Sequence, residues 1–310
     1  MTLTMNPALD VSTDTDHVAP GEKLRCGPTV LDPGGGGVNV SRVIHRLDGG
    51  TTAVYVAGGL TGDLFAKLLG DEGVPSHRIV IDGETRESFT VTEESTGKQY
   101  RFVLSGPQLS SANVDTVIEA LDSLLQPGDW LVASGSLPPG VPEDFYGQLA
   151  KKYVAQGVKV VVDTAPPWLA PAIAGGVFVV KPSRHELEQF LGRELPDLES
   201  QVAGAREMIA QTGAQWVALS LGKEGAVLVS ADHAWHAIAP GIKPVSTVGA
   251  GDSFLAGLVQ ALSVGESPEG ALAYAVAAGS ATAMSPATAL CERQVVEGVL
   301  AGVVTTTLLP

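Results

Sequence analysis

The chain has 310 residues, 45% of them hydrophobic and 17% charged, and its formal net charge at pH 7 is −15. This composition is too apolar for a disordered chain, and the length predicts one large α/β domain with an appendage, or two domains. The negative charge argues against nucleic-acid binding, which needs a basic surface. The longest nearly apolar run, residues 271–284, is shorter than the roughly 20 residues of a membrane helix. With no secretory signal and two cysteines, the default compartment is a reducing cytoplasm.

Short β-branched segments alternate with longer helical patterns along most of the chain. The expected strands are residues 52–57, 130–134, 158–163, 177–181 and 216–220, and an amphipathic helix is expected over residues 143–155. Strands that alternate with helices in this way form a parallel sheet with helices on both faces. The sequence therefore predicts a doubly wound, three-layer α/β/α core with a mainly parallel central sheet.

Two stretches, residues 11–32 and 79–104, break this alternation. Their alternating polar and apolar residues predict antiparallel strands with one solvated face. We expect them to form a small β-sheet lid over the strand ends, where open α/β sheets bind ligands. The whole chain, residues 1–310, is then a single domain with a lid.

The lid is expected to contain a hairpin of residues 88–93 and 99–104. On its second strand Tyr100, Phe102 and Leu104 share one face, while Arg101 and Val103 point the other way. A sheet this small cannot bury an apolar face by itself. The simplest partner is the same lid on a second copy, which predicts a homodimer.

A run of four glycines, residues 34–37, precedes Asn39 on the first turn of an expected helix. One interpretation is a flexible turn with Asn39 near a helix cap. Because four glycines cost considerable backbone entropy, a ligand touching the main chain is favoured. Asn39 offers a donor and an acceptor, and Asp10 offers two acceptors at the end of the first expected strand, which suits a polyol. Asp10 alone could equally be a turn carboxylate.

Basic residues gather on the two lid stretches of this acidic chain: Lys23, Arg25, Arg86 and Arg101. Each one separately is expected to be a solvated surface charge. Together they suit a terminal phosphate, since the planar donors of arginine match two oxygens at once. After the expected strand 177–181, Glu186 lies at a helix start, where it either orders metal-bound water or is a plain first-turn glutamate.

The segment Ser246-Thr-Val-Gly-Ala-Gly-Asp-Ser253 leads directly into an apolar helical pattern. Its glycines permit close approach, and the first N–H groups of a helix have no internal partner, so the loop predicts an anion hole. Asp252 is either a first-turn carboxylate favoured by the helix dipole or a general base for phosphoryl transfer. P-loop, dinucleotide-binding and protein-kinase motifs are absent.

In this order the motifs resemble the ribokinase-like (PfkB) carbohydrate kinases, since residues 247–252 match their C-terminal signature and the glycine run with Asn39 their N-terminal one. The resemblance covers nearly the whole chain. It is strongest to the bacterial minor 6-phosphofructokinases, through residues 21–26, 33–37, 99–102, 134–140, 220–222 and 246–253. It implies phosphorylation of fructose 6-phosphate at its 1-hydroxyl by ATP. The 1-phosphofructokinases and tagatose-6-phosphate kinases share this frame, but the former commonly carry Lys where Gly36 stands.

The resemblance also implies roles for individual residues. Asp252 would be the base, and the amides of Gly249, Ala250 and Gly251 the anion hole. The sugar phosphate would be held by Asp10, Lys23, Gly35, Gly36, Asn39, Arg86, Arg101 and Ser136. MgATP would be held by Lys181, Ser183, Glu186, Ser220 and Gly222, with Mg²⁺ reached from Glu186 through water. A monovalent cation, K⁺ in some members, would lie near Ser246 and Val248.

The chain departs from many relatives at two of these positions. It carries Ser246 where they have Asp, and Ser183 where they have Asn. These departures concern the cation and Mg²⁺ sites and leave the base and the anion hole unaffected. A catalytically inactive sugar-phosphate sensor on the same fold is the alternative outside enzymes, and the intact Asp252 and glycine loop argue against it.

Overall fold

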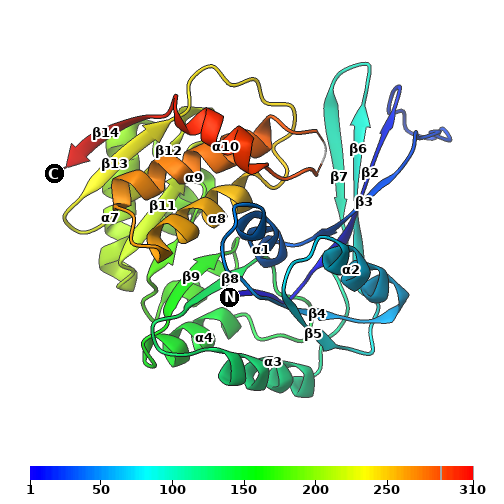
Figure 1. Ribbon diagram of the computed structural model, residues 1–310, viewed down its shortest axis with the longest axis horizontal. Helices are drawn as coiled ribbons and strands as arrows, with labels where there is room; N and C mark the ends of the chain where they lie inside the picture. The colour runs from blue at the N-terminus through cyan, green and yellow to red at the C-terminus, as the bar shows by residue number, and fades with distance from the viewer. Residues whose placement is uncertain (287, 310) are drawn as a thin grey trace.

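The structure, a computed structural model, describes residues 1–286 and 288–309, and Figure 1 shows a large twisted sheet beside a smaller one. The large sheet has ten strands, in the spatial order β14 (Val304–Leu309), β13 (Ala234–Ile238), β12 (Ala226–Val229), β11 (Trp216–Ser220), β10 (Val179–Val180), β9 (Lys159–Asp163), β8 (Trp130–Ser134), β1 (Thr2–Thr4), β4 (Ala53–Ala57) and β5 (Ser76–Val80). Neighbours from β11 to β5 pair in parallel, and β11 to β14 pair antiparallel. The mainly parallel sheet is as expected.

Helices cover both faces of this sheet (Figure 1). One face carries α1 (Gly36–Arg46), α2 (Gly59–Asp71), α8 (Ala250–Ser263), α9 (Pro268–Ala283) and α10 (Arg293–Leu300). The other carries α3 (Ser111–Leu124), α4 (Phe145–Val154), α5 (Leu169–Ile173), α6 (Arg184–Leu191) and α7 (Leu198–Thr212). In β9, Val160 and Val162 pack against the face that carries α3 to α7, whereas Val161 packs against the opposite face. Burial on both faces explains why this strand is an unbroken valine run.

The expected core elements differ from the observed ones mainly in length. Residues 130–134 and 216–220 coincide with β8 and β11, while residues 177–181 shorten to β10. The chain around β10 stays extended, since the N–H groups of Phe178 and Lys181 donate to carbonyls of Val160 and Val162 at 2.8 and 3.0 Å. None of the helices in the described residues has the length and apolar character needed to span a bilayer.

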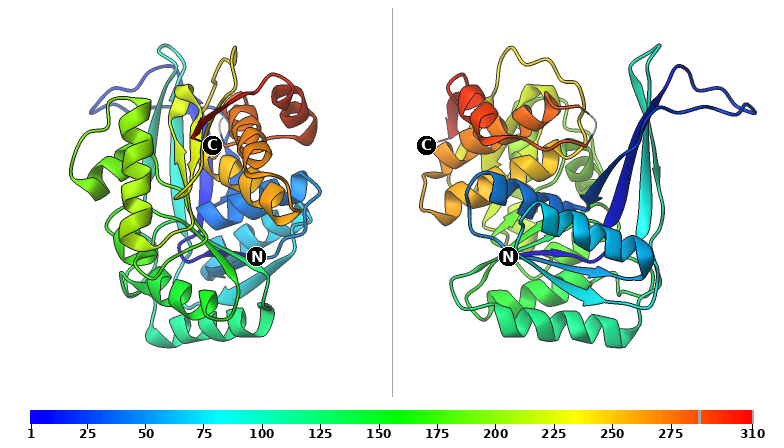
Figure 2. Two further views of the ribbon diagram at one scale, coloured as in Figure 1. Left: turned by 90° about the vertical axis from the view of Figure 1, so that its left-hand side faces the viewer. Right: turned by 45° about the vertical axis from the view of Figure 1, so that its right-hand side comes forward.

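The small sheet projects from the edge of the body (Figures 1 and 2) and has the strand order β3 (Val30–Gly34), β2 (Ala8–Thr15), β6 (Arg86–Glu93), β7 (Lys98–Val103). Its bounds differ from the expected residues 11–32 and 79–104. The first strand of the lid, β2, begins at Ala8 and contains Asp10. Asp10 therefore does not lie at the end of the first strand of the chain, which is β1. Ile79 and Val80 belong to β5 of the large sheet. We call this small sheet the lid.

The central pairing of the lid also corrects the expectation of antiparallel strands, because β2 and β6 run parallel. Between them the chain passes through β3, α1, β4, α2 and β5, so it returns to the lid by a crossover. A hairpin would have reversed its direction, whereas a crossover through the body restores it. The β6–β7 hairpin is antiparallel, as expected.

The register of the lid separates its two faces, because directly paired residues lie on the same face. Leu31, Val11, Phe89 and Phe102 form one row across all four strands. Asp32, Asp10, Ser88 and Val103 form a row on the opposite face, which also carries Arg86 and Arg101. Ser12 and Gln99 of this second face hydrogen-bond to Thr288 and Ser246, so it is the face turned to the body.

Candidate active site

The start of α8 offers backbone N–H groups that have no partner within the helix. Gly249 is its N-cap, with φ of 73° in the left-handed region, and no side chain caps the helix. A residue with a Cβ adopts this backbone conformation at a cost, which accounts for glycine here. The N–H groups of Gly251 and Asp252 in the first turn have no intrahelical partner, and that of Ala250 donates to the carbonyl of Thr247 in the preceding loop at 3.3 Å. The anion hole predicted at residues 249–251 therefore falls at the N-terminus of a helix of 14 residues, the backbone setting in which anions bind.

Asp252, in this first turn, meets Asn39 from the first turn of α1. The amide Nδ2 of Asn39 donates to Oδ2 of Asp252 at 2.9 Å. Burial, and next the charge of Asp163, raise the pKa of Asp252 to about 7, against the opposing effects of Asn39 and Lys181. A carboxylate with a pKa near neutrality is suited to accept a proton at physiological pH.

Lys181 and Asp163 form a buried ion pair beside the anion hole. Lys181 Nζ lies 3.1 Å from Asp163 Oδ1, and a Cβ placed on Gly251 would lie 3.6 Å from the same Nζ. Burial disfavours the lysine charge, but the surrounding carboxylates, Asp163 foremost, raise its pKa, so it stays cationic. Sequence reasoning had Asp163 only as the end of a strand. An acid directly after a buried valine run, at the carboxyl end of a parallel strand, was the available signal.

The residues expected on the nucleotide side lie together at the ends of β10 and β11. Ser183 forms a β-bridge with Ser220, and Gly222 begins the short helix η1 (Gly222–Glu224) just beyond. Ser183 is also the N-cap of α6, where its N–H donates to Glu186 Oε2 at 2.7 Å. Glu186 is thus a capping-box glutamate, and its carboxylate has further lone pairs for a metal-bound water.

The glycine run is explained by close packing within the chain. A Cβ on Gly34 would lie 2.0 Å from Asp10 Oδ2, and one on Gly36 would lie 2.2 Å from Ser134 Oγ. Gly35 has φ of 116°, in the region that favours glycine. Neighbouring protein atoms thus already restrict these positions to glycine, and the expected contact of a ligand with this main chain stays a prediction.

The lid face turned to the body carries a mixed charge. Burial raises the pKa of Asp10 to about 6, while Arg101 and Arg86 act to lower it. Arg101 is exposed, whereas Arg86 is engaged: Nε and Nη2 donate to the carbonyl of Asn6 at 3.2 and 3.0 Å, and Nη1 to that of Leu104 at 2.8 Å. Arg86 therefore fastens the lid to the body as well as facing Asp10.

Asn6, which sequence reasoning missed, joins three of these segments. Its carbonyl accepts from Arg86, and its Nδ2 donates to Ser136 Oγ at 3.0 Å and to the carbonyl of Ser105 at 3.1 Å. Ser136 is thereby placed beside the junction of lid and body. Lys23, in contrast, is exposed in the β2–β3 loop, which projects away from the body (Figure 2). The structure does not bring Lys23 to Asp10 within one chain.

The loop before α8 connects the body to the lid. Ser246 is buried, its hydroxyl donates to Gln99 Oε1 of β7 at 3.4 Å, and it accepts from the N–H of Val248 at 3.3 Å. The N–H groups of Val245 and Ser246 donate to the carbonyl of Ala283 at 2.7 and 3.2 Å. Val245 and Ser246 thus lie against the carboxyl end of α9, and Val248 is joined to this loop through Ser246.

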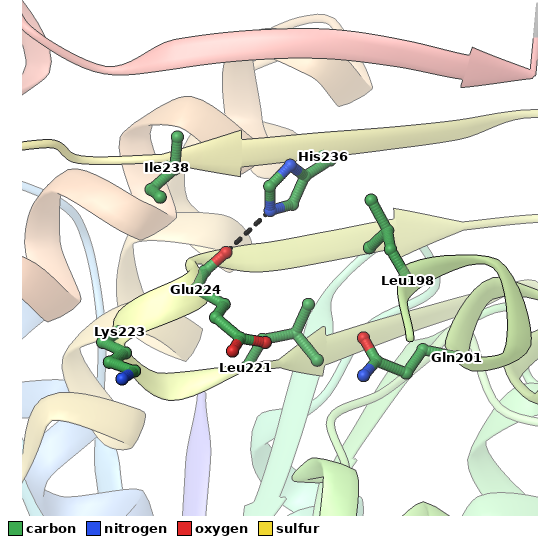
Figure 3. A pocket seen from close by; sticks show the side chains of 7 residues that line it. All are labelled: Leu198, Gln201, Leu221, Lys223, Glu224, His236 and Ile238. Atoms are coloured by element: carbon green, nitrogen blue, oxygen red, sulfur yellow. Dashed lines mark hydrogen bonds between the residues drawn. The ribbon is translucent and has the colours of Figure 1, made fainter. Parts of the chain in front are cut away.

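A separate pocket lies on the other side of η1, and Figure 3 shows the residues that line it. They are Leu198, Gln201, Leu221, Lys223, Glu224, His236 and Ile238. His236 closes one side by a hydrogen bond of 2.7 Å between Nε2 and the carbonyl oxygen of Glu224. None of the candidate site residues lines this pocket.

The arrangement has the parts that phosphoryl transfer to a hydroxyl needs, namely a carboxylate base, an anion hole and a buried cation. A family model of pfkB family carbohydrate kinases matches residues 4–294. The chain therefore belongs to the pfkB family of carbohydrate kinases, enzymes that transfer a phosphoryl group to a sugar hydroxyl.

Named relatives narrow this class. The ATP-dependent 6-phosphofructokinase isozyme 2 of Mycobacterium tuberculosis is 45% identical over 299 residues, which cover 96% of this chain and 87% of the relative. The isozyme 2 of Escherichia coli K12 is 38% identical over 94% of each chain. The crystal structure of E. coli phosphofructokinase-2 with substrates and products matches 97% of each chain, with a TM-score of 0.93 and 37% identity. These comparisons confirm the expected family and fold.

Proposed function

We propose that the protein is an ATP-dependent 6-phosphofructokinase that phosphorylates the 1-hydroxyl of fructose 6-phosphate. The observation that carries this proposal is that Asp252, at an uncapped helix N-terminus, feels the charge of Asp10, which shares its lid face with Arg86 and Arg101. A base beside an anion hole suits the transfer, and the lid arginines suit a phosphate already on the sugar. The names of the relatives and the E. coli structure with fructose-6-phosphate support this sugar.

In the proposed mechanism Asp10 and Asn39 hold the sugar hydroxyls, and the lid arginines hold the 6-phosphate. Asp252 accepts the proton of the sugar 1-hydroxyl. The oxygen of this hydroxyl bonds to the γ-phosphorus of ATP while the bond between that phosphorus and the leaving ADP oxygen breaks. The amides of residues 249–251 and Lys181 stabilise the charge on the transferring group.

MgATP, when bound, supplies the phosphoryl group. The residues that would hold it are Lys181, Ser183, Glu186, Ser220 and Gly222. They fit a polyphosphate, because a buried ammonium lies beside a helix N-terminus that no side chain caps. Mg²⁺ would be reached through water on Glu186.

A monovalent cation, K⁺, is proposed at the loop of Ser246 and Val248. This loop lies against the carboxyl end of α9, where backbone carbonyls and the helix dipole favour a cation. The crystal structure of E. coli phosphofructokinase-2 with potassium supports the proposal.

An acceptor panel with MgATP tests the function. We expect the highest kcat/KM with fructose 6-phosphate, ahead of fructose 1-phosphate and tagatose 6-phosphate. A 1-phosphofructokinase of Xanthomonas campestris is 36% identical over 84% of this chain, and fructose 1-phosphate is therefore the alternative acceptor. A preference for either of the other sugars would assign the chain to the corresponding kinase. Tight sugar binding without turnover would favour the inactive sensor.

The outer face of the lid supports a homodimer. Its apolar row runs from Phe102, which is 56% exposed, through Phe89 and Val11 to Leu31, which is 37% exposed. An exposed apolar row across a whole sheet favours burial against another copy. Since the β2–β3 loop projects away from its own sugar-side residues, Lys23 would contribute to a sugar site only across such a dimer.

We expect Phe102→Asp to be monomeric in light scattering and to have impaired steady-state activity, because a charge within the interface is costly to bury and the lid then loses its support. Leu60→Asp is the matched control, since Leu60 is 81% exposed on α2, outside the lid. This variant should remain a dimer with normal activity. A fully active Phe102→Asp monomer would show that the lid works alone.

We also propose that the chain is one kinase domain that acts in the reducing cytoplasm. The N-terminal helix α1 and the C-terminal helices α8 and α9 share one core, which supports a single domain. Both cysteines, Cys26 and Cys291, are free thiols, which fits a reducing compartment.

A further inference from the structure

A buried arginine lies one turn beyond Asn39 on α1. Arg42 is only 2% exposed, although arginine is among the residues least often buried. Its Nε donates to both carboxylate oxygens of Glu72, at 2.9 and 3.0 Å, and its Nη2 reaches Glu72 and Asp32, the latter at 3.1 Å. Asp32 lies in lid strand β3, and Glu72 directly follows α2. Two carboxylates from separate elements therefore hold the guanidinium in one orientation.

The remaining two donors of Arg42 face Pro33 and Asn39. Nη1 donates to the carbonyl of Pro33 at 3.0 Å and to Oδ1 of Asn39 at 3.3 Å. Arginine has five N–H donors and no acceptor, and here all five have partners. The atom of Asn39 that faces Arg42 must therefore be its oxygen.

This constraint decides which atom of Asn39 faces the base. With Oδ1 turned to Arg42, Nδ2 is turned to Asp252 and donates to its Oδ2 at 2.9 Å. An amide free to rotate could present its oxygen to the carboxylate instead, which would repel the ionised form. A donor stabilises the ionised form, the one that can accept a proton.

We propose that Arg42 is a positioning residue that fixes the amide of Asn39 so that it donates to Asp252 and keeps the base ionised. The inference rests on the proposal that Asp252 is the base. It adds a chain of contacts from Glu72 and Asp32, through Arg42 and Asn39, to the reacting group.

Other groups act on the same carboxylate, and the test must separate them from Arg42. Those that face Asp252 are the amides of its own helix start, Asn39 from α1, Asp10 from β2, Asp163 at the end of β9 and Lys181 after β10. Arg42 also acts on Asp10, whose pKa its charge lowers. A substitution of Arg42 alone would change this field and leave Glu72 without its main partner.

The double variant Arg42→Met/Glu72→Gln removes both charges of the pair and keeps the net charge. We expect its acid limb in the pH profile of kcat/KM to move up by about one pH unit, since the ionised base has lost an oriented donor. Activity would then fall about tenfold at a pH below the limb and recover at higher pH. This recovery is not expected of a merely structural role.

The matched control is Arg46→Met/Glu292→Gln. Arg46 lies on the same helix as Arg42 and pairs with Glu292 at 3.1 Å, outside the chain of contacts that leads to Asn39. This control loses the same number of charges, while Arg42 keeps Glu72, Asp32 and Asn39 as partners. Its acid limb should coincide with that of the unchanged protein.

A second set of variants separates the route from the field. In an Asn39→Ala background the Arg42→Met/Glu72→Gln change should no longer move the limb, because the amide it orients is gone. If the double variant does not fold, Arg42→Lys provides the same comparison: it keeps the charge with one nitrogen in place of three and should move the limb in the same direction.

An unmoved limb in a folded Arg42 variant overturns the inference, and so does an equal loss of activity at every pH. A shift that persists in the Asn39→Ala background overturns the route through Asn39. Full activity in Asp252→Asn would overturn the proposed base itself, which is a different failure from an unmoved limb in a chain that needs Asp252.

Discussion

Replacing Asp252 by Asn should lower kcat by roughly 10²- to 10⁴-fold at saturating ATP and sugar, the range by which general bases contribute. The substitution keeps the size of the side chain and an oxygen that can accept from Asn39 Nδ2, so the contact of 2.9 Å can be retained. It removes only the ability to accept a proton. Sugar binding, measured by titration, should be largely kept. A variant within threefold of the unchanged protein would contradict the role of base.

Stability measurements on the same variant separate chemistry from structure. Because the pKa of Asp252 is raised to about 7 from the ordinary 3.8 of an aspartate, folding favours its protonated form. The ionised form therefore costs stability above pH 7, a cost that decreases as the pH falls from 7 towards 4. Asp252→Asn should unfold at a higher temperature than the unchanged protein at pH 8, with a smaller difference at pH 4. An inactive but more stable variant excludes misfolding as the cause.

The control for the helix dipole is Glu269→Gln. Glu269 is an exposed acid in the first turn of α9, so it has the plain dipole role that was the alternative for Asp252. Removing such a carboxylate costs about 0.3–1 kcal/mol of stability. We expect Glu269→Gln to keep full activity. If Asp252→Asn behaved in the same way, the dipole role would account for both residues.

The core of the fold was predictable because its signals are local. The valine run of β9 indicates a strand buried on both faces. The glycine loop before α8 indicates the start of a helix. The parallel pairing of β2 with β6 was not predictable from these signals. It depends on the path of the chain through α1 and α2, and a pattern within one short segment carries no information about that path.

The site shows the same division between local and distant information. Asp252 and Asn39 were found from their motifs, but Asp163, Asn6 and Arg42 were missed, although each contacts one or more of the candidate residues. These three act through partners far away in the sequence, so nothing beside them marks their role. Sequence reasoning also treated the four lid cations as one cluster, whereas the structure distinguishes Arg86, which holds two carbonyls, from the exposed Arg101.

Because of that difference, Arg101 and Arg86 should respond differently to removal. Arg101→Ala should lower kcat/KM for fructose 6-phosphate. The loss of transition-state stabilisation should be about 2–5 kcal/mol, the cost of removing one partner of a charge pair in a binding site. Free fructose, measured as an acceptor at high concentration, should be barely affected. Arg86→Ala should lose activity with both sugars, because it also releases the carbonyls of Asn6 and Leu104.

Lys98→Ala is the matched control for both arginines. Lys98 is exposed on β7, the strand of Arg101, and the odd spacing of three residues places it on the opposite face. It loses the same unit charge, so any long-range effect of charge on an anionic sugar would appear in this variant as well. Equal losses with fructose and fructose 6-phosphate in Arg101→Ala would make that arginine structural, and equal losses in Lys98→Ala would reduce its role to general attraction. A loss confined to Arg101→Ala and to the phosphorylated sugar would assign the lid face turned to the body as the 6-phosphate site.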